Sequence, residues 1–164
     1  MIQTKTIGRI LASSSPQAQA KLVGSKKYNA IRGIVSFYDL RQAILIASSL
    51  SGIPTMGYPC GTRILGFHIH QGTSCSGTEN DPFANAGMHY NPENCKHPLH
   101  AGDLPPLFAM NGMAWSCFLT TRFSIKDILG RTVILHAMPD DLHTQPSGNS
   151  GEKIACGVIR SVRQ

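Results

Sequence analysis

The stretch from Gly66 to Asp103 reads GFHIHQGTSCSG at positions 66–77 and AGMHYNPENCKHPLHAGD at positions 86–103. Five of the seven histidines of the chain lie in it: His68, His70, His89, His97 and His100. Charged residues make up only 15% of the sequence, so the gathering of imidazoles stands out. Metal binding is the simplest physical reason for it, and we expect a metal centre in this region.

His68 and His70 stand two residues apart in RILGFHIH, an apolar run that reads as a strand. Because successive side chains of a strand alternate between faces, both imidazoles point to one side while Ile69 points into the apolar layer. The pair forms half of a metal site. His136 ends a later strand, RTVILH, and can complete the set.

A second ligand set lies in a Gly/Pro/Asn-rich loop that can fold round an ion: His89, His97, His100 and Asp103. Imidazoles with one carboxylate suit tetrahedral zinc, and a set of nitrogens alone points to copper. Imidazole also binds iron and nickel, so spacing by itself leaves the metal open. A single histidine is more often a hydrogen-bonded core or loop residue, and we expect His143, which has no partner nearby, at the surface.

The composition and net charge of the chain limit which classes of protein and partner are compatible with it. A chain of 164 residues suits one domain with a proper core, and no run is long enough to span a membrane. The net charge is +6, but no basic block alternates with aromatic residues, so we expect no nucleic-acid partner and favour a small anion. Residues 1–17 read as a flexible tail with no convincing secretory signal, which favours a cytoplasmic protein.

Several short β-branched runs separated by Gly/Pro turns predict an all-β fold, an antiparallel sandwich or barrel. One helical turn is expected at 124–130, and no regular element in the long loop at 71–113. The expected strands are 18–24, 29–38, 41–50, the run ending at His70, 115–123, the run RTVILH and the run IACGVIRSV.

The motifs GFHIH (66–70), HYNP (89–92), HPLHAGD (97–103), LGRTVILHAMPDD (129–141) and GNSGEKIACGVI (148–159) resemble those of the copper/zinc superoxide dismutase family. The resemblance covers roughly residues 18 to 160. It implies a Greek-key antiparallel β-sandwich or barrel, immunoglobulin-like, with two long loops forming the metal site. It places one dismutase domain at 18–164.

The resemblance also implies the activity and the ligands. Two superoxide anions and two protons would become dioxygen and hydrogen peroxide by copper redox cycling, with zinc structural. His89 would be shared by both ions. The implied copper ligands are His68, His70, His89 and His136, and the implied zinc ligands are His89, His97, His100 and Asp103.

Supporting roles follow from the same resemblance. Asp140 would hydrogen-bond one ligand of each metal. Cys75 and Cys156 would form the family's disulfide. Lys153 stands where the family usually has an arginine, and we expect it to guide the anion at reduced efficiency, because lysine lacks the rigid two-donor fork.

Several alternatives stay open. Cys60 and Cys95 either form a second bridge or are free thiols, and Cys117 reads as a small buried hydrophobe. A non-catalytic dismutase-like module that stores or donates copper or zinc is the main alternative function, although every ligand position is filled. A zinc hydrolase would need a nearby Glu base, and no H-E-x-x-H frame is present. A homodimer is compatible with the family but not indicated by the sequence.

Overall fold

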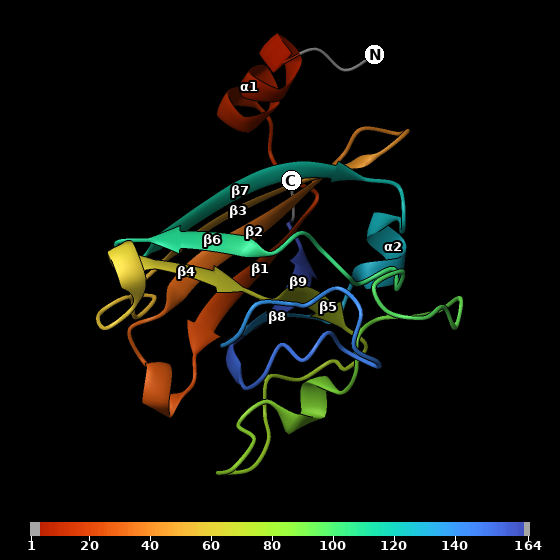
Figure 1. Ribbon diagram of the computed structural model, residues 1–164. Coiled ribbons are helices and arrows are strands. Elements are labelled where there is room, and N and C mark those ends of the chain that lie inside the picture. Colours follow the sequence, from red (N-terminus) through yellow and green to blue (C-terminus); the bar gives the residue numbers. More distant parts are fainter. Residues whose placement is uncertain (1–3, 163–164) are drawn as a thin grey trace.

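The computed structural model describes residues 4–162, and its body is one antiparallel sheet of nine strands curled into a nearly closed barrel (Figure 1). The strands are β1 Ala18–Gly24, β2 Arg32–Asp39, β3 Ile44–Ser51, β4 Thr62–Leu65, β5 Phe67–His70, β6 Leu107–Met110, β7 Met113–Thr120, β8 Thr132–His136 and β9 Lys153–Ser161. The helical elements are α1 Thr4–Ser13, α2 Ile125–Ile128, η1 Lys26–Tyr28, η2 Pro59–Gly61 and η3 Ala84–Ala86. The predicted all-β class is confirmed.

Gly66 explains how the barrel nearly closes. The strand order is β4-β6-β7-β3-β2-β1-β9-β8-β5, so β4 and β5 are the two edges of the sheet although only Gly66 separates them in sequence. A Cβ at Gly66 would lie 2.7 Å from Ser150 Oγ, and the Gly66 carbonyl accepts the His136 N–H at 2.8 Å. A residue without a side chain is therefore required where the chain passes from one edge to the other.

The core fills the inside of the barrel. In β1 the inward residues Ala18, Ala20 and Leu22 are buried, and Lys21 between them is exposed. This period of two matches the pleat of a strand with one face on the core. Phe37, Phe67 and Ile69 are fully buried in the same cluster, so Ile69 points into the apolar layer as predicted.

Residues 4–13, within the segment expected to be a flexible tail, form the helix α1, which stands apart from the barrel in Figure 1; residues 1–3 lie outside the described part. One expectation about an irregular segment is wrong. The stretch 71–113 contains β6, which pairs with β4 and β7. Asn111 and Gly112 form the β6–β7 turn with φ values of 50° and 80°, as a two-residue hairpin of type I′ requires.

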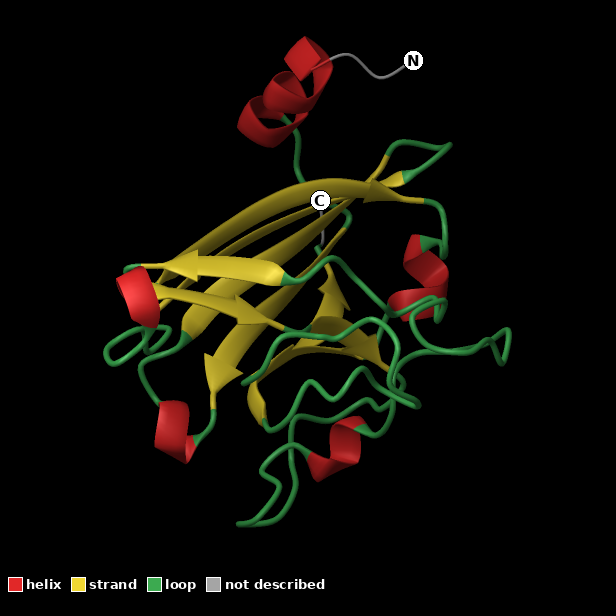
Figure 2. Cartoon of the chain, in the orientation of Figure 1, coloured by secondary structure: helices red, strands yellow, loops and turns green. Residues whose placement is uncertain are grey.

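The long loops gather beside β5 and β8, at one side of the barrel (Figure 2). They are the disulfide loop (residues 71–87), the histidine loop (88–106) and the late loop (137–152). The Cys75–Cys156 disulfide ties the disulfide loop to β9. Within residues 4–162, none of the helices is long and apolar enough to cross a membrane.

Candidate metal centre

The first group of imidazoles rests on two paired strands. His68 and His70 project from β5, whose register with β8 runs from Phe67↔Leu135 to His70↔Thr132, and His136 ends β8. The histidine loop positions His89 at the site and pairs with β5 through a single antiparallel β-bridge between His89 and His70. One ring nitrogen from each of these four residues lies within 4.8 Å of the others. All four residues are buried, between 0% and 4% exposed.

The second group comes from the histidine loop alone. Its members are His89, His97, His100 and Asp103, again with ligand atoms within 4.8 Å of one another. A second isolated bridge pairs Asp103 with His68 on β5. His89 belongs to both groups, so the two sites adjoin at one ring.

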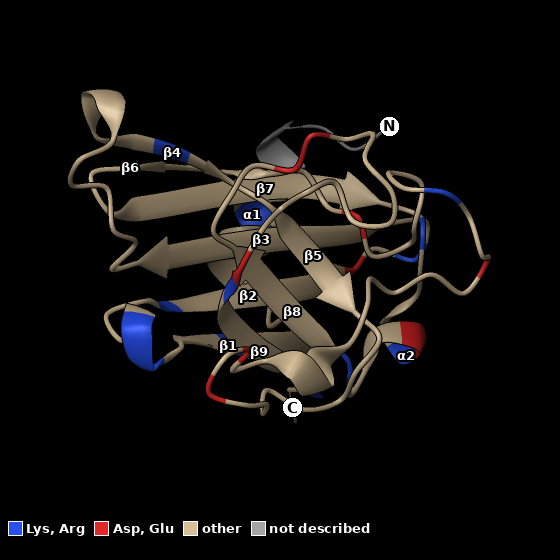
Figure 3. Cartoon of the chain, turned by 60° about the horizontal axis from the view of Figure 1, so that its bottom comes forward, with Lys and Arg blue, Asp and Glu red and all other residues tan. Residues whose placement is uncertain are grey.

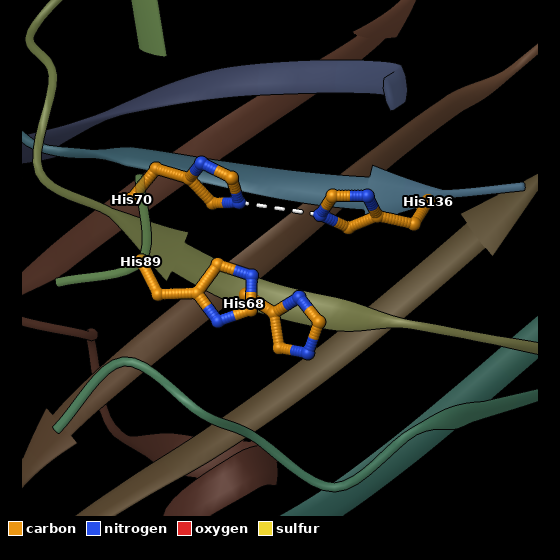
Figure 4. Close-up of side chains that lie close together, drawn as sticks. All are labelled: His68, His70, His89 and His136. Carbon is orange, nitrogen blue, oxygen red and sulfur yellow. Dashed lines mark hydrogen bonds between the residues drawn. The ribbon is translucent and has the colours of Figure 1, made fainter. Parts of the chain in front are cut away.

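Hydrogen bonds fix which nitrogen two rings of the first group present. His70 Nδ1 lies 2.8 Å from the Gly87 carbonyl, and His136 Nδ1 lies 3.1 Å from the Gly151 carbonyl. A carbonyl can only accept, so both Nδ1 atoms carry the proton, and Nε2 of each neutral ring is an acceptor. These two Nε2 atoms face each other at 3.2 Å (Figure 4). Two lone pairs directed at one another are unfavourable unless a cation lies between them.

The same conflict occurs in the second group. His97 Nε2 donates to Asp140 at 2.9 Å, which leaves His97 Nδ1 as an acceptor. That Nδ1 lies 3.1 Å from Asp103 Oδ2, and His100 Nδ1 lies 3.3 Å from the same oxygen. A carboxylate oxygen and imidazole lone pairs repel one another at this distance, and a divalent cation would satisfy them all.

Buried nitrogens without a partner mark the same places. Four ring nitrogens within the described residues are buried and accept or donate no hydrogen bond: His68 Nδ1, His89 Nε2, His97 Nδ1 and His100 Nδ1. Buried polar atoms are rarely left unpaired. His89 Nδ1 faces Asp103 Oδ1 at 2.7 Å while its Nε2 is free, and the His89 and His68 ring centroids are 4.0 Å apart (Figure 4). His89 therefore directs one nitrogen to each group, and the residues fit two metal ions.

Asp140 links the two groups through hydrogen bonds to one ring of each. Its carboxylate accepts from His68 Nε2 at 2.6 Å, from His97 Nε2 at 2.9 Å and from the Leu142 N–H at 2.7 Å. Burial alone would raise the pKa of Asp140, but these hydrogen bonds outweigh burial, and the pKa lies well below its usual value. Asp140 stays ionised and holds both rings with Nδ1 toward the metal sites.

Burial also prepares the imidazoles as ligands. Desolvation lowers the pKa of His68 to about 4, against the opposing hydrogen bond to Asp140, and lowers that of His136 to about 3. Desolvation and the neighbouring rings hold the pKa of His70 well below its usual value. These rings are therefore neutral near pH 7, the form that binds a metal.

Comparison with known proteins decides the family. The model of the copper/zinc superoxide dismutase (SODC) family matches residues 31–159. The chain belongs to the copper/zinc superoxide dismutase family. The resemblance predicted from the motifs is thereby confirmed.

Individual relatives of this chain include three bacterial dismutases. The Cu-Zn superoxide dismutase of Photobacterium leiognathi is 39% identical over 109 residues, which cover 58% of this chain and 63% of that protein. The Cu-Zn superoxide dismutase 2 of Aquifex aeolicus is 29% identical over 163 residues, 90% of this chain and 89% of that protein. Cu-Zn superoxide dismutase 1 of the same organism is 33% identical over 143 residues, 78% of this chain and 79% of that protein.

The structure places the residues predicted from dismutase motifs as follows. The metal-ligand candidates lie in the two groups expected, Asp140 contacts one ring of each, and the Cys75–Cys156 disulfide is present. His143 is at the surface, its side chain 79% exposed. The second bridge considered for Cys60 and Cys95 is absent, because both are free, exposed thiols on separate loops.

Two residues of this dismutase centre were not predicted from the sequence. Asp81, in the disulfide loop, forms an ion pair with Lys153 at 2.7 Å. Arg122, after β7, donates from Nη1 to the carbonyls of His100 and Asp103, each at 3.1 Å. Neither residue lies in a metal-ligand motif, and only the folded arrangement of the loops brings them to the site.

Proposed function

We propose that this chain is a superoxide dismutase, converting two superoxide anions and two protons into dioxygen and hydrogen peroxide. The observation that supports this most strongly is His89, which directs one nitrogen to each of two complete ligand groups. A metal store would need no ring shared in this way, and a hydrolase would need an open position with an acidic base.

The donor sets assign the ions. The four nitrogens of His68, His70, His89 and His136 would hold copper, and the group that includes Asp103 would hold zinc. When bound, copper supplies a one-electron redox couple. Zinc, whose oxidation state does not change, supplies a fixed positive charge.

His89 links the two sites chemically. Its Nδ1 is directed to the Asp103 group, so its Nε2 is the atom that can take up and release a proton at the all-nitrogen group. A ring that binds two cations gives up its second proton more readily than free imidazole. The His89 Nε2 proton is therefore a source for one of the two protons that the peroxide product requires.

The remaining residues orient ligands and attract the substrate. Asp140 holds His68 and His97 from behind, and the burial of all four histidines excludes bulk water from the all-nitrogen group. Lys153 pairs across the sheet with His136, and its charge contributes to the low pKa of that ring. An ammonium group so close to the site would draw in a small anion.

We also propose that the chain forms a homodimer through the outer face of β4, β6 and β7. Large apolar side chains are exposed on this face and, beyond β3, on β2 and β1: Val23, Ile34, Ile64, Phe108, Met110, Met113 and Trp115. Most of them line one shared hollow, and a contiguous exposed apolar patch of this kind marks a protein–protein interaction site. A second copy offers the same apolar patch, which suits a self-complementary interface. Analytical ultracentrifugation should show a dimer that Trp115→Glu dissociates and that Leu129→Glu, at the residue after α2, does not.

The activity is tested by superoxide consumption. The protein loaded with copper and zinc should consume superoxide rapidly, and His136→Ala, which removes one nitrogen of the first group, should lose most of that rate. Metal content and the visible spectrum distinguish the enzyme from the non-catalytic metal-binding module. Equal copper and zinc with a d–d band supports the enzyme, whereas bound metal with no superoxide consumption would support the non-catalytic module.

A further inference from the structure

The ammonium group of Lys153 is not free in solution. Its Nζ lies 2.7 Å from Asp81 Oδ2, and the lysine side chain is only 17% exposed. The neighbouring acid, Glu152, is engaged elsewhere, since it accepts from Lys27 Nζ at 2.8 Å and from Tyr28 at 3.1 Å. Asp81 is therefore the only acid that neutralises Lys153 among the described residues.

The carboxylate of Asp81 is held in place by its own loop. Its Oδ1 accepts the Phe83 N–H at 3.2 Å, and its backbone N–H donates to Thr78 Oγ1 at 3.1 Å. The Asp81 carbonyl accepts the N–H groups of Thr78 and Ala84. Because one oxygen is used inside the turn, the other is directed at Lys153. The disulfide from Cys75 to Cys156 anchors the same loop to β9, three residues beyond Lys153.

The position of the pair matters because Lys153 lies beside a member of the first group of imidazoles. Lys and Arg are spread over several elements in Figure 3 rather than gathered on one of them. Lys153 is the cation that pairs across the sheet with His136. A negative charge at 2.7 Å cancels most of the field that this cation would project to an approaching anion.

We propose that Asp81 is a positioning residue that restrains Lys153 and reduces the attraction of the site for anions. The proposal rests on the function proposed above, and it concerns how strongly superoxide and other small anions are drawn to that site. The ion pair weakens the attraction of the site for anions, but it also holds the ammonium group of the flexible Lys153 side chain in one position. Removing the charge of Asp81 should make the site more attractive to anions.

The test compares Asp81→Asn with Glu79→Gln. Asparagine keeps an oxygen to accept the Phe83 N–H, so the turn is preserved while the charge is lost. Glu79 is an exposed acid of the same loop with no ion pair in the described structure, so its substitution changes net charge equally without touching Lys153. Azide, a small anion that binds copper, is the probe, and its dissociation constant is measured on the copper- and zinc-loaded protein at low and high salt.

Asp81→Asn should bind azide about two- to five-fold more tightly than the wild type at low salt, with the difference shrinking at high salt. Glu79→Gln should change the constant much less, and in a Lys153→Gln background the Asp81→Asn gain should be largely lost. The proposal would be overturned if Asp81→Asn and Glu79→Gln changed azide affinity equally. It would also be overturned if Asp81→Asn gave its full gain in azide affinity in the Lys153→Gln background.

A second readout needs no metal. In the metal-free protein, the Lys153 ammonium should give a slowly exchanging NMR signal that Asp81→Asn removes and Glu79→Gln retains. Absence of that signal in the wild type would show that the ion pair does not restrain Lys153. This measurement holds whether or not the loaded protein consumes superoxide, so failure of the proposed function and failure of this inference are told apart.

Discussion

His68 Nε2 donates a hydrogen bond to Asp140 Oδ2 at 2.6 Å. The other oxygen of Asp140 accepts from His97 Nε2 at 2.9 Å, so one carboxylate orients one ring of each metal group. Asp140→Asn replaces this double acceptor with an amide that can accept through only one atom. We expect copper and zinc affinity each to fall about ten- to a hundred-fold.

Metal content after dialysis against a chelator measures this loss. Asp141→Asn is the matched control, because the Asp141 carboxylate bonds only to His143 and Thr144 in its own turn. Retention of both metals by Asp140→Asn to the same extent as by the control would contradict the role given to Asp140.

Arg122 should stabilise the histidine loop. Its guanidinium donates to the carbonyls of His100 and Asp103, two residues of the second group, at 3.1 Å each. Arg122→Gln removes these donors and should speed the loss of zinc to a chelator several-fold, with copper less affected. Arg160→Gln, an exposed arginine on β9, makes the same change elsewhere and should leave zinc release unchanged. Identical rates of zinc release from the two variants would contradict the stabilisation of the histidine loop by Arg122.

The metal-free protein should lose stability as the pH falls from about 6.5 toward 4. His68 and His136 have folded-state pKa values of about 4 and about 3, below the usual value of about 6.5 for an unfolded chain. In this window the unfolded chain binds protons that the folded protein does not, so the free energy of unfolding decreases with falling pH. Below about pH 4, protonation of Asp140 and Asp103, whose pKa values are lowered, adds to the loss.

Urea unfolding of the metal-free protein at several pH values gives this slope. His136→Gln removes one of the groups and should make the slope shallower. A free energy of unfolding that stays constant between pH 6.5 and 4 would refute the assignment of neutral, buried imidazoles.

Lys153→Arg should raise the rate of superoxide consumption at low salt. Arginine can engage Asp81 with one part of its fork and present further N–H donors to an anion, which lysine cannot do. The gain should shrink as salt screens the field. Rates of Lys153→Arg and wild type that agree at every salt concentration would show that the residue does not guide the substrate.

The metal ligands could be predicted from the sequence because local patterns specify them. The i,i+2 pair at His68 and His70 follows from strand alternation, and the family motifs supply His136 and Asp140. β6 was missed because it is only four residues long and follows Pro105-Pro106. Its signal was the Asn111-Gly112 dipeptide between two apolar runs, which is typical of a tight hairpin.

Contacts between distant segments were beyond sequence reasoning. Asp81 and Lys153 are 72 residues apart and meet because the disulfide loop folds back onto β9. Arg122 reaches the histidine loop from the end of β7. The pairing considered for Cys60 and Cys95 failed for the same reason, since proximity to a metal motif in sequence says little about where a thiol lies in the barrel.

The shared ring of His89 is tested most directly by counting protons released on metal binding. At about pH 8 free imidazoles are already neutral, so binding one ion releases few protons from the ligands. With zinc bound, addition of copper should release about one further proton per chain, because His89 must lose its second ring proton to contact both ions. His89→Gln, titrated identically, should release none. A wild-type protein that binds both ions without releasing more protons than this variant would contradict the account.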